Sequence, residues 1–372
     1  MSSALLNATL EHLRALVAVN TTNPPREPGR ARRILDLIDA ILRECGFVCE
    51  RMDFGEGCLA LLAMRGKRPR ILFNNHLDTV PAADGWSDDP FTLRITGDHA
   101  IGLGACDVKG AAACWIAAAQ QTDGEAAMLF TTDEEAGQSV CVRSFLKEHR
   151  DLLTSFDAAI VAEPTNCRAV TAHRGLATSA GVFTGTAGHG SSPRALRDSA
   201  IHEAVRWAAA AIEHARGCEG DSFGPLTGVR FNIGTFEGGI KANMIATEAR
   251  VRFGIRPLPG QSTDEAIRDF QQRAPDSDRV RWSTGFSGPS LPAAPADAAA
   301  AIDKAQHVAG QLRLPLGEPV DFWSEASLFS QAGLTSLVFG PGDIGQAHRP
   351  DEAVPRADLE SGTATYARLL SS

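Results

Sequence analysis

Five short segments of this chain place acidic or histidine side chains directly beyond apolar runs or glycine-rich turns. They are residues 74–81, 102–110, 131–137, 161–165 and 340–352. Apolar runs of this length are typical of buried strands, and ligands of open α/β sheets bind just beyond the carboxyl ends of the strands. If the five segments meet at one sheet edge, their imidazoles and carboxylates form a mixed nitrogen and oxygen set that suits zinc, cobalt or manganese.

The first two segments each allow two interpretations. His76 follows the apolar run 71–74, and Asp78 lies two residues later, on the same side of an extended chain. A carboxylate beside a metal-bound imidazole fixes its tautomer, whereas the alternative is a polar pair that ends the strand. Asp107 stands before an alanine-rich stretch. It would either cap that helix, a common use of Asp, or present both of its oxygens to metal ions.

Three consecutive acids, residues 133–135, follow the apolar run 127–131. Adjacent carboxylates repel one another, which favours a nearby cation or a raised pKa. One of Glu134 and Glu135 would bind metal while the other acts as a general base on water; a solvated acidic loop is the alternative. Taken singly, Glu163 fits an exposed turn, and His348 fits a surface loop, better than a metal site. Taken together, the segments predict a centre in which a shared carboxylate holds two ions roughly 3.5–4 Å apart.

The elements around these residues predict an α/β fold. Continuous apolar strands alternate with helices up to about residue 173 and again after 285, which implies a mostly parallel sheet covered by helices on both faces. Between them, a strictly alternating strand at 248–255 and the order strand, helix, strand, strand, helix, strand predict a ferredoxin-like α+β insert. We therefore expect a catalytic domain formed by residues 1–173 and 285–372, with a domain of roughly 110 residues at 174–284.

Composition excludes several classes of protein. The 372 residues are 44% hydrophobic and 22% charged, which is typical of a folded two-domain protein. A net charge of -9 argues against nucleic acid or an anionic membrane as a partner. The eight cysteines form no CxxC pair, which indicates reduced thiols and a cytoplasmic location. The longest apolar run, 111–119, is too short to span a bilayer. No Gly-x-Ser-x-Gly motif supports a serine hydrolase.

In their combination and order, the motifs resemble the two-zinc amidohydrolase and metallopeptidase family that includes acetylornithine deacetylase, succinyl-diaminopimelate desuccinylase, aminoacylase and glutamate-releasing carboxypeptidases. The likeness extends from residues 21–25 to the C-terminus. The block 340–352 is similar to that of acetylornithine and N-acetylcitrulline deacetylases, and segments 239–245 and 322–327 favour the citrulline type. The resemblance implies a homodimeric hydrolase of linear amides that deacetylates N-acetylornithine or N-acetylcitrulline in arginine biosynthesis. Succinyl-diaminopimelate, dipeptides and other acyl-amino acids are alternative substrates, and a non-catalytic binding protein is the alternative class.

The resemblance also implies a role for each motif residue. Two divalent ions would be bound, zinc first, with cobalt and manganese as alternatives. The ligands of one ion would be His76, Asp107 and Glu163, and those of the other Asp107, Glu135 and His348. Asp78 would orient His76, and Glu134 would carry the proton from the attacking water to the leaving amine. The peptide bond between Asp107 and Val108 would be cis.

The insert resembles the lid and dimerisation domain of the same family. His189, within the segment 188–192, would reach across the dimer to the substrate carbonyl oxygen and stabilise the oxyanion. Asn243 and Arg256 would hold the carboxylate and backbone of the substrate, for which a guanidinium fork is suited. Lys241 is a candidate contact to a polar end of the substrate. The expected small-molecule partner is an N-acylated amino acid.

Overall fold

The computed structural model describes residues 2–293 and 297–371, which divide into two compact units. Unit 1 comprises the chain up to Thr171, Ala300–Gly317 and the chain from Ser324 onward. Unit 2 comprises Ala172–Ala299 and Glu318–Trp323. Unit 2 therefore extends beyond the expected end at 284, because its last strand continues to Gly288 and a later segment, 318–323, belongs to it.

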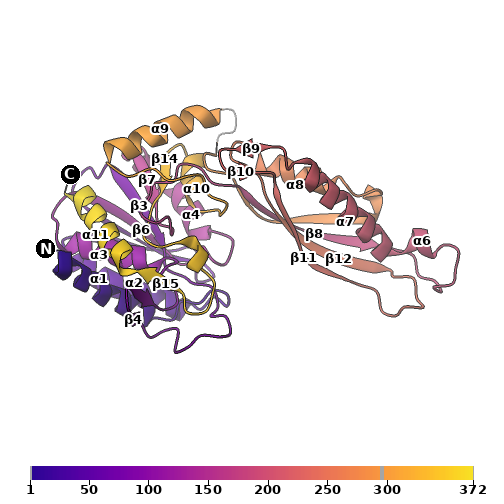
Figure 1. Ribbon diagram of the computed structural model, residues 1–372, viewed down its shortest axis with the longest axis horizontal. Coiled ribbons are helices and arrows are strands. Elements are labelled where there is room, and N and C mark those ends of the chain that lie inside the picture. Colours follow the sequence, from indigo (N-terminus) through magenta and orange to yellow (C-terminus); the bar gives the residue numbers. More distant parts are fainter. Residues whose placement is uncertain (1, 294–296, 372) are drawn as a thin grey trace. The chain divides into compact units, whose positions relative to one another are not determined.

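Unit 1 contains a six-stranded mixed sheet in the order β1-β2-β6-β3-β7-β14 (Figure 1). These strands are β1 (Val48–Asp53), β2 (Leu59–Arg65), β6 (Ala126–Thr131), β3 (Ile71–His76), β7 (Ala158–Val161) and β14 (Thr335–Val338). The last four are mutually parallel, whereas β1 and β2 form a hairpin whose second strand runs antiparallel to β6. The predicted α/β class with a mostly parallel sheet is confirmed, and the hairpin makes the sheet mixed.

Helices cover both faces of this sheet (Figure 1). One layer consists of α1 (Ser2–Val17), α2 (Pro28–Glu44), α3 (Lys109–Gln120) and α11 (Arg356–Leu370), packed around α3. Its alanines make α3 narrow, so α1 and α11 approach closely and every residue of Lys109–Ala119 is buried. The other layer contains α4 (Val140–Glu148), α5 (Arg150–Leu153) and α10 (Ala326–Gln331). A further helix, α9 (Ala298–Gln311), packs Ala305 and Ala309 into the main core.

Smaller elements complete unit 1. A three-stranded sheet is formed by β4 (Arg94–Thr96), β5 (His99–Ile101) and β15 (Ala353–Pro355). Because β15 forms there, the closing helix α11 begins only at Arg356. Asp39 of α2 accepts hydrogen bonds from Arg43, at 2.6 Å, and from Arg51 of β1, at 2.8 Å, which joins the helix to the edge of the main sheet.

Unit 2 is a four-stranded antiparallel sheet in the order β11-β12-β8-β13. Its main elements are β8 (Leu176–Thr184), α7 (Ala200–Gly217), β11 (Arg230–Gly238), β12 (Glu248–Arg256), α8 (Thr263–Gln271) and β13 (Val280–Gly288). Shorter elements are α6 (Ala195–Asp198), β9 (Ser222–Phe223) and β10 (Leu226–Thr227). The order matches the expected ferredoxin-like unit. Buried and exposed residues alternate along β12, as predicted, and α7 and α8 cover the buried face around Trp207.

No helix among residues 2–293 and 297–371 is long and apolar enough to cross a membrane. Within the same residues the eight cysteines are free of disulfide bonds.

Candidate metal centre

The parallel strands β6, β3, β7 and β14 bring four of the five polar segments to one edge of the main sheet. His76 is the last residue of β3, the acids 133–135 follow β6, and Glu163 lies two residues beyond β7. His348 lies in the long loop after β14, with a φ of +62° that non-glycine residues seldom adopt. The fifth segment leads into α3 and carries Asp107, and its Asp107–Val108 peptide bond is cis, as the motif resemblance implied.

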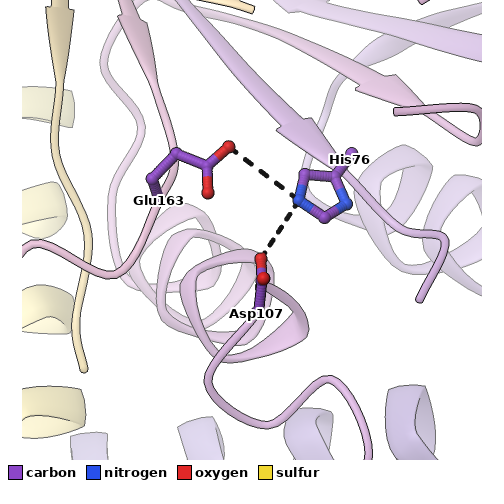
Figure 2. Close-up of side chains that lie close together, drawn as sticks. All are labelled: His76, Asp107 and Glu163. Carbon is purple, nitrogen blue, oxygen red and sulfur yellow. Dashed lines mark ion pairs between the residues drawn. The ribbon is translucent and has the colours of Figure 1, made fainter. Parts of the chain in front are cut away.

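Three side chains converge in the interior (Figure 2). Nε2 of His76 lies 3.3 Å from Oδ1 of Asp107 and 4.0 Å from Oε1 of Glu163, and both carboxylates face the same ring nitrogen. All three residues are buried. Their ligand atoms lie within 4.8 Å of one another, so a single cation could contact all three. Asp107 makes no side-chain cap on α3, whose N-cap is Val108, so the alternative of a helix-capping aspartate does not apply.

A second group of three shares Asp107 with the first. Nε2 of His348 lies 3.3 Å from Oδ2 of Asp107 and 3.1 Å from Oε1 of Glu135. These ligand atoms also lie within 4.8 Å of one another. One oxygen of Asp107 therefore faces each group, which is the arrangement of a carboxylate that bridges two cations.

The electrostatics of this cluster fit a cation. Burial raises the pKa of Glu163 well above its ordinary value, and the neighbouring charge of Asp107 adds to the effect. Contacts with Asp107 and Glu135 raise the pKa of His348 to about 10. Oδ1 of Asp107 is buried and accepts no hydrogen bond. Three acids gathered around two imidazoles, with a buried oxygen unsatisfied, would be stabilised by divalent metal, which favours the ionised forms. The residues present thus fit two metal ions.

Glu134 differs from its neighbours. Its carboxyl group makes no hydrogen bond among the described residues and joins neither ligand group. Burial raises its pKa well above the ordinary value; the His76 charge opposes this shift, and the charges of Glu135 and Glu163 reinforce it. Asp133, the first of the three acids, instead accepts hydrogen bonds from the N–H groups of Val140, at 2.5 Å, and Cys141, at 3.1 Å, at the start of α4. The structure therefore separates the three consecutive acids into three different environments.

Asp78 contacts more than the imidazole it was expected to orient. Nδ1 of His76 lies 3.1 Å from the backbone oxygen of Asp78 and 3.6 Å from its carboxylate. The carboxylate itself accepts hydrogen bonds from the backbone N–H of Glu134, at 3.2 Å, and of Glu135, at 3.0 Å. Asn23 donates a third, at 3.0 Å. Asp78 thus fixes the backbone that carries two of the acids.

Sequence reasoning missed three buried polar residues beside the centre. Asn23 hydrogen-bonds Asp78, and Glu352 accepts hydrogen bonds from the N–H groups of Gly104, Cys106 and Asp107 at 2.7–3.0 Å. Glu325 precedes α10, and burial raises its pKa to about 8. All three lie within segments whose likeness to the family was recognised, but no pattern in the sequence distinguishes them from exposed polar residues.

The expected substrate contacts of unit 2 fall into two groups. His189, Lys241 and Asn243 lie in loops at one end of the sheet, where the N–H of Gly190 donates to the oxygen of Asn243 at 2.8 Å. His189 and Asn243 are exposed. Arg256 is the last residue of β12, at the opposite end of the sheet. An extended strand as long as β12 spans about 26 Å from its first residue to its last.

Comparison with known proteins identifies the family. The model of the family described as Peptidase family M20/M25/M40 matches residues 72–372. The chain belongs to this family. It is 48% identical to the N-acetyl-L-citrulline deacetylase of Xanthomonas campestris pv. campestris over 370 residues, which cover 99% of this chain and 98% of the relative. It is 29% identical to the acetylornithine deacetylase of Proteus mirabilis, with 91% and 89% covered.

A solved M20 family metallo-carboxypeptidase from Sulfolobus solfataricus, Sso-CP2, has a similar fold. The TM-score is 0.76 at 14% identity, with 97% of this chain and 98% of that chain covered. The M20 membership confirms the family inferred from the motifs and the enzyme class, a hydrolase that acts on amide bonds.

Proposed function

We propose that this M20 family member deacetylates N-acetyl-L-citrulline, with a two-metal centre at the strand ends of unit 1. The observation that carries the proposal is the pair of ligand groups joined by Asp107, with the unbonded carboxyl group of Glu134 beside them. The relative that is 48% identical over almost the full length of both chains supports the choice of substrate. N-acetyl-L-ornithine is the second candidate, supported by the acetylornithine deacetylase relatives. Either substrate would place the enzyme in arginine biosynthesis.

In this proposal His76, Asp107 and Glu163 hold one ion, and Asp107, Glu135 and His348 hold the other. The nitrogen and oxygen donors suit zinc, with cobalt and manganese as alternatives. When bound, the metals would polarise the amide carbonyl and lower the pKa of the attacking water.

The residues of the chain perform the proton transfers. Glu134 accepts a proton from the attacking water and later gives it to the nitrogen of the departing amine, and a raised pKa suits both steps. The Asp78 carboxylate accepts hydrogen bonds from the backbone N–H groups of Glu134 and Glu135. These bonds fix the general base, Glu134, relative to the metal ligand, Glu135. Acetate and the free amino acid leave as products.

The positions within unit 2 support a homodimer as the active form. His189 and Asn243 lie at one end of β12, and Arg256 lies at the other. An N-acyl amino acid is far shorter than this strand, so one substrate cannot contact both ends in one subunit. We therefore propose that His189, with Asn243 and Lys241 at the same end of the sheet, acts on a substrate bound to the partner subunit, and that Arg256 contacts a different substrate molecule. There His189 would donate a hydrogen bond to the developing oxyanion.

The function is tested by amine release from N-acetyl-L-citrulline, N-acetyl-L-ornithine and N-succinyl-diaminopimelate, assayed side by side with zinc. We expect turnover of the citrulline substrate, loss of turnover after treatment with a chelator, and recovery when zinc is added back. Glu134→Gln should lower kcat by about 10²–10⁴-fold with metal content unchanged, since a general base contributes that factor. Glu50→Gln, at an exposed position of β1, is the matched control. Cleavage that survives the chelator would refute the two-metal mechanism, and cleavage of another substrate alone would refute the substrate assignment.

Mixing two inactive variants tests the proposed dimer. A heterodimer of His189→Ala and Glu134→Gln subunits contains one site with an intact Glu134 and an intact His189 from the other subunit. We expect activity to reappear after the two variants are unfolded together and refolded. If His189 acted within its own subunit, no such site would exist and the mixture would stay inactive.

A further inference from the structure

Unit 1 contains a large cavity at the opposite end of the main sheet from the candidate metal centre. Its volume is about 1020 Å³. Arg70 and Asp157, which directly precede β3 and β7, line it together with Thr335, the first residue of β14, and with residues of α4, α5, α9 and α10. The metal centre lies beyond the ends of the same strands. A molecule bound in this cavity is therefore remote from the reacting groups and is not the hydrolysed substrate.

The lining of the cavity is strongly cationic. It contains five basic side chains and a single acidic one. The basic residues are Arg70, Arg143, Lys147, Arg150 and Lys304. The acid, Asp157, lies 2.5 Å from Arg70. The whole chain has a net charge of -9, so this concentration of positive charge is a local feature that opposes the overall balance. A concave surface of one charge sign concentrates ions of the opposite sign.

Three of the cations have no ion-pair or hydrogen-bond partner for their side chains among the described residues. The side chains of Lys147, Arg150 and Lys304 make no ion pair or hydrogen bond in the part of the chain that the structure describes, and all three residues are exposed. They come from three different helices, α4, α5 and α9, and all three line the same cavity. Their mutual repulsion is therefore relieved only by solvent, salt or a bound anion.

The cavity also offers apolar surface between the cations. Leu146, Leu153, Phe156, Val308, Leu328 and Leu334 contribute to its lining. A lone inorganic anion would leave these side chains uncovered. The volume slightly exceeds the usual range for small-molecule pockets, about 300–1,000 Å³. Size, charge and apolar lining together fit an amphipathic polyanion.

We propose that this cavity binds an organic polyphosphate of nucleotide size, with its phosphates on Lys147, Arg150 and Lys304 and its apolar part on the leucines and Phe156. The site is separate from the hydrolytic centre and does not depend on which acyl-amino acid the enzyme cleaves.

The test measures ATP binding to the full-length protein by isothermal titration calorimetry at low ionic strength. Metal is first removed on a chelating resin, because bound metal would itself attract phosphate. The test variant is Lys147→Glu with Lys304→Glu, which cancels the excess of positive over negative side chains in the lining. The matched control is Arg14→Glu with Arg33→Glu, two exposed positions on α1 and α2 on the other face of the sheet. Adenosine and pyrophosphate serve as partial ligands.

We expect ATP to bind the unmodified protein, the test variant to raise Kd at least about tenfold, and the control variant to change Kd less than about twofold. Adenosine should fail to bind, and pyrophosphate should bind more weakly than ATP. The proposal is wrong if ATP does not bind, or if it binds the test variant and the unmodified protein equally well. Pyrophosphate binding as tight as that of ATP would refute the role of the apolar lining.

Discussion

Asp78→Asn tests the inference that this carboxylate fixes the acidic loop. The wild-type Oδ2 accepts from Asn23 and from the N–H of Glu135, while Oδ1 accepts from the N–H of Glu134. In its better orientation, asparagine keeps the first two hydrogen bonds and turns its amide N–H₂ toward the N–H of Glu134. The N–H of Glu134 then loses its acceptor, which costs about 1–3 kcal/mol. The two hydrogen bonds from Asn23 and Glu135 change from charge-assisted to neutral, which costs about 1 kcal/mol each. The expected loss of stability is about 3–5 kcal/mol.

The assay is urea unfolding of the metal-free protein, so that lost metal affinity does not contribute, followed by kcat of the zinc-loaded protein. Asp133→Asn is the matched control. Oδ2 of Asp133 accepts from both Val140 and Cys141, so an amide oxygen in that position keeps both bonds, and we expect a loss of only about 1–2 kcal/mol. The inference is refuted if Asp78→Asn unfolds within about 1 kcal/mol of the wild type and retains its kcat.

Two further predictions follow from local geometry and charge. A Cβ on Gly340 would lie 2.6 Å from the backbone oxygen of Glu163, so Gly340→Ala should displace this predicted ligand and weaken zinc affinity at least about tenfold in a competition titration. In the control Gly345→Ala, the Cβ would meet only a flexible side chain at 3.2 Å, so zinc affinity should stay unchanged. If both variants lost zinc affinity equally, the prediction would be wrong. Burial raises the pKa of Asp39, but its two arginine partners outweigh this and hold the pKa below its ordinary value of 3.8. That stabilisation is present above pH 4 and is lost as the pH falls through the lowered pKa. Asp39→Asn should therefore lower the free energy of unfolding in urea by about 1–3 kcal/mol at pH 5–8, and the difference from the wild type should become smaller below pH 4. A difference that does not change with pH would show that the charge of Asp39 is not its source.

The sequence by itself determined the fold class and the positions of the chemical groups. Each short apolar run specifies both a buried strand and the polar residue that follows it, because strand length and side-chain type are local properties. Such runs lead to His76, to the acids 133–135 and to Glu163. The parallel order of these strands then places the three segments at one edge. The alternation in β12 similarly predicted a sheet with one exposed face in unit 2.

Only the tertiary structure decided how these groups are held and divided. Each oxygen of Asp107 faces a different histidine, and the consecutive acids 133–135 enter three different environments. The residues that support them are distant in the chain: Asn23 lies 55 positions from Asp78, and Glu352 lies 245 positions from Asp107. Hydrogen bonds over such separations depend on the packing of whole helices and strands. Local sequence patterns report propensity and periodicity, and they carry no record of which distant backbone N–H a buried carboxylate will meet.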